Sequence, residues 1–185
     1  MKSKRNLLFR SLFFLAVIFL CIGSAKRVDA AAAAKIGSRR YKTVAKALYA
    51  AKNGDTVKLL RNASYIIDVL DKDPIKKKKI TINLNHKTLD IMGRMRITKK
   101  SNVKIKNGKI ITSSPGHFRV EGKSKVTMTN CTLETNSGSG FMVSGKKSSL
   151  KLNKCTGLLD GAGITAEKKA SLTVNKGSYR IRNYS

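Results

Sequence analysis

The sequence predicts an all-β solenoid, a short stack of coils built from parallel strands. Stretches of similar pattern recur at intervals of 21 to 24 residues, and each starts with two apolar residues separated by a polar one. The copies are INLNHK from Ile82, VKIKNG from Val103, VTMTNC from Val126, LKLNKC from Leu150 and LTVNKG from Leu172. Apolar–polar alternation indicates a strand with one buried face. A repeat near 22 residues is typical of a solenoid, in which each coil buries its apolar face against its neighbours.

Residues 1–30 are predicted to be a secretory signal peptide. A basic start is followed by an apolar run from Leu12 to Ile22, and the small residues around Ala30 suit signal peptidase. The apolar run is short for a membrane span, although an uncleaved anchor is the alternative interpretation. Cleavage after Ala30 leaves 33 basic and 9 acidic side chains, a net charge of +24.

Residues 31–40 are expected to be a linker, and residues 41–53 a helix. The apolar residues of the helix fall on one stripe: Val44, Ala47, Leu48 and Ala51. Gly54 is suited to end this helix because glycine accepts a left-handed conformation. A helix with one apolar stripe must cover something, and the exposed end of the solenoid is the expected partner.

The run TVAKALYAAKNGDTVKLLRNASY, from Thr43 to Tyr65, resembles the opening of right-handed parallel β-helix proteins of the pectin-lyase-like superfamily. Together with the repeats, the resemblance covers residues 41–185. It implies a secreted bacterial protein in which the helix caps the first coil and residues 54–185 form a β-helix of about 5–6 coils. It carries no catalytic residue with it.

Each regular coil is expected to contain three short parallel strands, separated by turns that are rich in Gly, Asn and Lys. Residues 66–79 are the least regular stretch and are expected to form a loop or an irregular early coil. The last copy stops in or just after a strand without a capping segment. The sequence therefore predicts a fragment, a truncated product or one half of an end-to-end assembly.

Lysines recur at one position of the repeat, and the net charge of +29 indicates an anionic partner or environment. Counted three residues back from the apolar start of each copy, these are Lys79, Lys100, Lys123, Lys147 and Lys169. Coils that rise by about 4.8 Å would stack these lysines into a ladder. Their repulsion costs stability unless anions occupy the ladder. The alternative is that flexible lysines fill a solvated turn and discourage edge aggregation.

The strand before this turn adds outward side chains, among them Arg96 and Arg119. In the resembling family this strand and its flanking turns form the groove that holds acidic polysaccharide. The resemblance thus implies that Arg96, Arg119 and the five lysines bind the polymer. Aromatic residues interleaved with basic ones, as base stacking requires, are absent, so specific nucleic-acid binding is not indicated.

The positions of the carboxylates indicate whether the chain has a catalytic site, because polysaccharide-cleaving members of the family use clustered acids. The acids of the regular coils are Asp90, Glu121, Glu134, Asp160 and Glu167. Those that share a repeat position lie two coils apart, about 10 Å. Neither His86 nor His117 has an acid or Cys at metal-ligand spacing. We therefore expect no catalytic residue, no metal site and no cofactor.

Cys131 and Cys155 occupy the same position in adjacent coils, where the flanking copies have Gly. Stacked backbones lie within disulfide reach, and an exported protein meets an oxidising compartment. A need for a small residue at the turn explains both Cys and Gly, and parallel neighbours rarely offer suitable torsions. A free, partly buried pair is the favoured interpretation, and a disulfide is the alternative.

The expected function is a secreted or cell-surface module, adhesin-like or associated with the cell wall. It would bind an acidic polysaccharide or wall polyanion without catalysis, and have no membrane span once the signal is removed. The alternatives are a polysaccharide lyase or hydrolase with an incomplete active site, or a structural stalk. An acidic cluster in further sequence would favour the enzyme, whereas an anchor or more repeats would favour the adhesin or the stalk.

Overall fold

A computed structural model describes residues 31–66, 74–113, 117–136, 140–160 and 163–182. The predicted signal peptide and half of the irregular stretch at 66–79 lie outside these residues. From residue 32 onward the chain belongs to one compact unit. A search of the described residues for a helix of sufficient length and apolarity to cross a membrane found none.

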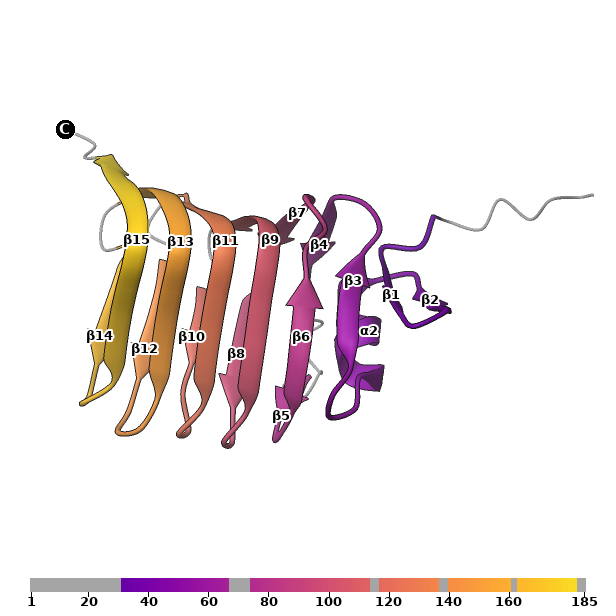
Figure 1. The fold of residues 1–185 in the computed structure, drawn as a ribbon, viewed down its shortest axis with the longest axis horizontal. Helices are drawn as coiled ribbons and strands as arrows, with labels where there is room; N and C mark the ends of the chain where they lie inside the picture. The colour runs from indigo at the N-terminus through magenta and orange to yellow at the C-terminus, as the bar shows by residue number, and fades with distance from the viewer. Residues whose placement is uncertain (1–30, 67–73, 114–116, 137–139, 161–162, 183–185) are drawn as a thin grey trace, which may run out of the picture. The chain divides into compact units, whose positions relative to one another are not determined.

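The main sheet of this unit contains one strand from each successive coil, and these strands are parallel to one another. Figure 1 shows them side by side in chain order. They are β3 (Thr56–Leu59), β6 (Lys79–Asn83), β9 (Asn102–Thr112), β11 (Lys125–Thr135), β13 (Ser149–Asp160) and β15 (Ser171–Arg182). Two short strands, β4 (Ala63–Tyr65) and β7 (Thr88–Ile91), pair with one another, and β7 also pairs with β9.

The second sheet is parallel throughout and supplies the other side of each coil. Its strands are β5 (Ile75–Lys76), β8 (Arg94–Thr98), β10 (His117–Val120), β12 (Gly140–Ser144) and β14 (Ile164–Glu167). Two parallel sheets wound by one chain confirm the predicted all-β solenoid. The described residues make about five turns, in agreement with the expected number.

Two of the three strands predicted per coil are fused in β9, β11, β13 and β15. The first half of β9 pairs with β6, and its second half pairs with β7. One residue at the bend has a positive φ of 51° to 61° in each of these strands: Asn107, Asn130, Lys154 and Lys176. The next residue must be small, because a Cβ on Gly108 would lie 2.5 Å from the Cβ of Leu84. Cys131 and Cys155 follow the same bend in the next two coils.

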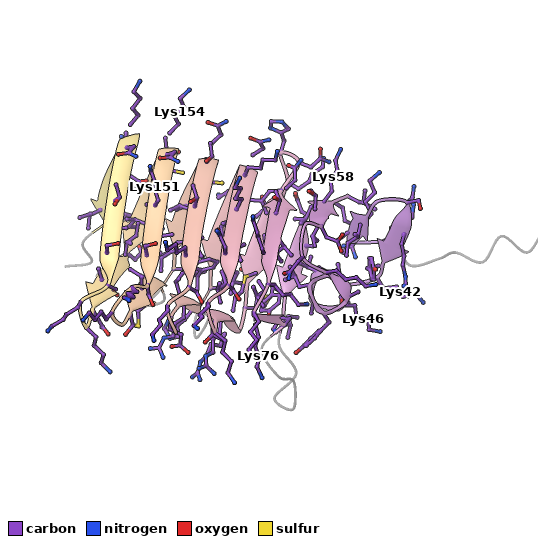
Figure 2. All side chains as sticks on the ribbon, turned by 60° about the horizontal axis from the view of Figure 1, so that its bottom comes forward. Lys42, Lys46, Lys58, Lys76, Lys151 and Lys154 are labelled. Atoms are coloured by element: carbon purple, nitrogen blue, oxygen red, sulfur yellow. The ribbon has the colours of Figure 1, made fainter. Side chains whose placement is uncertain are left out.

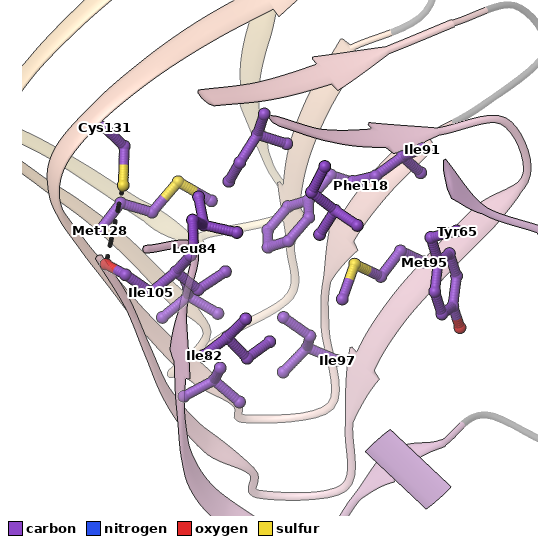
Figure 3. Close-up of a cluster of buried hydrophobic side chains, with 14 of the residues drawn as sticks. Tyr65, Ile82, Leu84, Ile91, Met95, Ile97, Ile105, Phe118, Met128 and Cys131 are labelled. Atoms are coloured by element: carbon purple, nitrogen blue, oxygen red, sulfur yellow. Dashed lines mark hydrogen bonds between the residues drawn. The ribbon is translucent and has the colours of Figure 1, made fainter. Parts of the chain in front are cut away.

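Inward-facing side chains stack into apolar rows that run from coil to coil (Figure 3). One row contains Ile82, Ile105, Met128 and Leu152, and another contains Met95, Phe118 and Phe141. The rings of Phe118 and Phe141 have centroids 5.6 Å apart. Burying each of these side chains fully is worth about 1.5–3 kcal/mol, so the rows hold the coils in register.

The N-terminal end of the solenoid differs from the sequence expectation in one respect. Residues 31–40, expected to be a linker, contain β1 (Ala34–Ile36) and most of β2 (Arg39–Tyr41), which form an antiparallel hairpin. β1 also pairs with β3 in antiparallel fashion, so the hairpin covers the first edge of the main sheet. The small residues of the segment allow this, because Ala33 and Ala34 are buried against the core.

The single helix of the described residues, α2 (Val44–Ala50), lies inside the predicted range of 41–53. The side chain of Thr43 caps it by accepting a hydrogen bond from the backbone N–H of Lys46 at 3.2 Å. Val44, Ala47 and Leu48 are buried, so the predicted stripe faces the core. The helix contacts β1 through β4 and thereby covers the first coil.

At the other end, Leu172 and Val174 of β15 continue the rows of Leu150 and Leu152. They remain 36% and 48% exposed, whereas Leu150 and Leu152 are fully buried. The described residues thus leave apolar surface at this end, and end-to-end association through it stays a prediction.

Candidate functional site

Lysines stack where the second sheet turns into the main sheet. We call this row the lysine corner, and each member stands two residues before a main-sheet strand. Its members are Lys77, Lys100, Lys123, Lys147 and Lys169. All five side chains are exposed. Within the described part of the chain, none forms an ion pair with a carboxylate.

The first member corrects the sequence prediction, which placed Lys79 in this row. Lys79 pairs with Asn102 as the first residue of β6, so it lies on the strand beyond the corner, and Lys77 takes its place. The prediction aligned Ile82 with Val103, but the structure aligns Ile80 with Val103. The cause is the turn after β6, which contains four residues where the next coil has two.

The backbone of the corner is unusual for lysine. All five members have positive φ angles, from 55° at Lys77 to 68° at Lys147. In this left-handed region the Cβ crowds the following carbonyl oxygen, at a cost of roughly 1–2 kcal/mol for residues other than Gly. Gly, Asn or Asp would adopt the same turn at lower cost. The backbone conformation therefore does not explain why these five positions are lysine.

A row of buried serines fixes the position of the corner. Ser101, Ser124 and Ser148 follow lysines 100, 123 and 147 in the chain and are at most 1% exposed. Each hydroxyl accepts a backbone N–H from the preceding coil at 3.1 Å, from Lys78, Ser101 and Lys123 in turn. These bonds tie each turn to its neighbour, so the lysines keep the spacing of the coils, about 4.8 Å.

A groove of about 760 Å³ runs along the corner. All of its lining residues are lysine or serine: Lys100, Lys123, Lys125, Lys147, Ser148, Ser149, Lys169 and Ser171. A second hollow of about 480 Å³ continues it toward the N-terminal end, where Lys77 and Lys99 join the lining. The groove therefore offers ammonium groups and hydroxyls, both hydrogen-bond donors to anions.

The two arginines of the predicted site lie on the second sheet, in register with one another and with Met142. Arg96 is bound to the carboxylate of Glu121 through Nε at 3.0 Å and also through Nη2. Nη1 of Arg119 lies 4.0 Å from the same carboxylate, and its Nη2 contacts the sulfur of Met142 at 2.9 Å. Glu121 thus offsets much of their charge, and neither arginine lines the groove.

Most of the chain matches one known protein family. Residues 54–179 match the family described as the right handed beta helix region. The chain belongs to the right-handed β-helix family. No curated protein and no solved structure is significantly similar to it.

Four carboxylates in the described coils of this β-helix protein have side-chain partners, and these partners differ from one acid to the next. Besides Glu121, Glu134 binds Lys109 at 2.5 Å, Asp160 binds Arg182 at 2.8 Å, and Asp90 accepts a hydrogen bond from Ser113 at 2.7 Å. Asp90 and Glu134 lie two coils apart, with Ile111 between them. The described residues contain no group of three metal-ligating side chains. Nothing in this part of the chain forms the acid pair or calcium cluster that polysaccharide cleavage uses.

Six lysines and serines that line the groove and the adjoining hollow were not among the predicted site residues: Lys77, Lys99, Lys125, Ser148, Ser149 and Ser171. The apolar alternation Ile80–Ile82 would have placed Lys77 correctly, had it been given priority over the turn that follows. Lys125, Ser149 and Ser171 are stacked in register at the start of β11, β13 and β15. No sequence signal marks them, because exposed strand ends of any solenoid carry polar residues.

Proposed function

We propose that this right-handed β-helix protein binds a linear acidic polymer in the groove along the lysine corner, without cleaving it. The polymer would run along the solenoid axis, across the strands, so that successive anionic groups meet successive lysines. Acidic polysaccharide and phosphate-containing wall polymer both fit this description.

The observation that carries the proposal is five exposed lysines at positive φ, none of which forms an ion pair with a carboxylate of the described residues. A solvated turn needs no lysine there, and a glycine or asparagine would relieve both the backbone strain and the repulsion between neighbours. An anionic polymer offsets that repulsion, which in water is about 1 kcal/mol or less for each neighbouring pair. Lysines elsewhere on the surface, such as Lys58, Lys76 and Lys151 in Figure 2, add a general attraction for polyanions.

The groove runs past Lys100, Lys123, Lys147 and Lys169, which span three coil steps or about 14 Å. A single extended polymer chain laid along this row would meet one lysine of the corner in each coil.

A pair of double variants tests the proposal. Lys147→Asn with Lys169→Asn removes two lysines of the corner, and Lys154→Asn with Lys176→Asn removes two lysines from the opposite bend of the same two coils. All four have positive φ angles, so the change in charge and in backbone preference is matched. Binding to teichoic acid and to polygalacturonate is measured at several salt concentrations, with uncharged dextran as the blank.

We expect the corner variant to bind at least tenfold more weakly than the control variant. Its dependence on salt should also flatten by up to about one unit of slope for each lost contact, by analogy with counterion release from nucleic acid. Equal losses in the two variants would mean that the polymer follows total charge, and would refute the groove.

Export to the cell surface is part of the same proposal. It is supported by the basic, apolar and small-residue order of residues 1–30. Amino-terminal sequencing of the protein from culture medium and from the wall fraction should give a chain that starts at Ala31. Recovery of the intact chain from the cell interior alone would contradict it.

A further inference from the structure

Cys131 and Cys155 form a stacked pair at the bend of the main-sheet strands. The residues on either side of them are paired in register, Thr129 with Asn153 and Thr132 with Thr156. The two side chains have the same orientation, since each sulfur contacts the carbonyl oxygen two residues earlier, at 3.4 Å. Neighbouring strands lie about 4.8 Å apart, within the Cα separation of 4.4–6.8 Å that disulfides span.

The pair is enclosed by the coils on both sides. Gly108 stacks against Cys131, and Gly177 stacks against Cys155. A Cβ on Gly177 would lie 2.2 Å from the carbonyl oxygen of Cys155, so no larger residue fits above the pair. The sulfur of Cys131 also points to the carbonyl oxygen of Ile105 at 3.8 Å (Figure 3). Cys131 is 3% exposed and Cys155 is fully buried.

Each of the two stacked thiols shifts the pKa of the other. The hydrogen bond from Cys131 lowers the pKa of the Cys155 thiol to about 7. The same bond, together with burial and the nearby Cys155 charge, raises the pKa of Cys131. Cys155 is thus the better nucleophile of the two, because the thiolate is the form that attacks disulfides.

We propose that Cys131 and Cys155 are a modification site that is oxidised to a disulfide between adjacent coils by exchange with a small disulfide. The Cys155 thiolate attacks the external disulfide, forms a mixed disulfide and releases one thiol. Cys131 loses its proton and attacks the sulfur of Cys155, which releases the second thiol. The protein loses two electrons and two protons, and the external disulfide gains them.

The last described coil controls access to the pair. β15 covers Cys155, and nearly all of its residues are themselves exposed. Burial raises the pKa of Tyr179 in this strand to about 12, and the nearby thiols of Cys155 and Cys131 contribute to the shift. Its hydroxyl is buried without a hydrogen-bond partner among the described residues. A weakly packed strand opens more readily than the interior coils, so exchange in the folded protein should require the opening of β15.

The test uses the full chain with Cys21→Ser, so that no third thiol takes part. The reduced protein is incubated with glutathione disulfide at neutral pH, both folded and during refolding, and its thiols are then counted under denaturing conditions. We expect two free thiols to fall to none, the mass to fall by two hydrogen atoms, and peptide mapping to give a Cys131–Cys155 link. The oxidised chain should unfold roughly 5–10 °C higher, because the disulfide closes a loop in the unfolded chain.

Single variants separate this site from a merely structural pair of small residues. Cys131→Ser removes the attacking partner, so the chain should stop at the mixed disulfide and lose the gain in unfolding temperature. In Cys131→Ala, which has no donor at this position, the remaining thiol should also need a higher pH for alkylation, because the hydrogen bond from the Cys131 thiol is gone. Two thiols that stay free after refolding in glutathione disulfide, or links that join different chains only, would overturn the proposal.

Discussion

The ammonium group of Lys78 donates hydrogen bonds to the carbonyl oxygens of Leu48, at 2.6 Å, and of Tyr49, at 2.9 Å. These carbonyls belong to the last turn of α2, where the backbone acceptors lack partners inside the helix and carry the negative end of its dipole. Burial lowers the pKa of Lys78, and the Asp55 carboxylate opposes this shift. One lysine next to the lysine corner thus connects the helix that covers the first coil to the turn before β6.

Replacing Lys78 by Met should therefore loosen the helix from the first coil. We expect Lys78→Met to lower the free energy of unfolding by about 1–2 kcal/mol, because it removes two charge-assisted hydrogen bonds and a favourable dipole contact. Urea unfolding measures the loss. Lys79→Met is the control, since the next side chain is exposed, and it should cost less than about 0.5 kcal/mol. Equal effects of the two substitutions would show that the contact with α2 contributes nothing.

Gly108 offers a second test of how the coils are stacked. A Cβ at this position would lie 2.5 Å from the Cβ of Leu84 and 2.6 Å from the carbonyl oxygen of Lys87. Because one of these atoms is backbone, Gly108→Ala should cost about 1–3 kcal/mol, as overpacking does. Cys131→Ala, at the same place in the next coil, removes volume instead and should cost about 1 kcal/mol or less. A thermal unfolding midpoint for Gly108→Ala at or above that of Cys131→Ala would contradict the stacking.

The sequence was sufficient for the solenoid because its determinants repeat. Alternation at Val103–Ile105, Val126–Met128 and Leu150–Leu152 recurs in every coil, so a wrong interpretation at one copy is corrected by the others. The hairpin of β1 and β2 has no such repetition. Ala33 and Ala34 are buried there because the first sheet edge needs a cover, which is a tertiary requirement that local composition does not show.

The candidate site was predictable in part for a related reason. Lys100, Lys123, Lys147 and Lys169 follow the regular coils and were placed correctly at the turn. Lys79 was not, because the two additional residues of the turn after β6 shift the copy by two positions. The pairing of Arg96 with Glu121 depends on side chains that meet across adjacent coils. Spacing alone gives the coil of a residue but not which acid its side chain reaches.

We expect the protein to have no polysaccharide-cleaving activity. Each acid of the described coils has its own basic or hydroxyl partner or stands alone, so none is arranged to share a proton with another or to hold calcium. Incubation with polygalacturonate, alginate and glycosaminoglycans, with and without calcium, should yield no new reducing or unsaturated ends. Cleavage that disappears in Arg119→Ala would instead favour the alternative of an enzyme.

The lysines of the corner should also lower the free energy of unfolding, because another residue type would suit the same backbone conformation better. Asparagine tolerates positive φ better than lysine does, so Lys147→Asn and Lys169→Asn should each raise the free energy of unfolding by a few tenths to about 1 kcal/mol. Lys151→Asn is the matched control in the same coil, because Lys151 lies on the extended strand β13, where asparagine is disfavoured. It should leave stability unchanged or lower it.

The opposite bend then separates backbone strain from function. Lys154→Asn and Lys176→Asn relieve a positive φ as well, so they should stabilise the fold to a similar degree. Only the substitutions at the lysine corner should combine a gain in stability with a loss of polymer binding, which is the compromise expected where a strained backbone serves a binding site. Unfolding free energies and affinities measured on the same four variants test this directly. If the variants at Lys147 and Lys169 gain stability without losing affinity for the polymer, the corner is only a solvated turn. If they lose stability, the positive φ angles carry no strain.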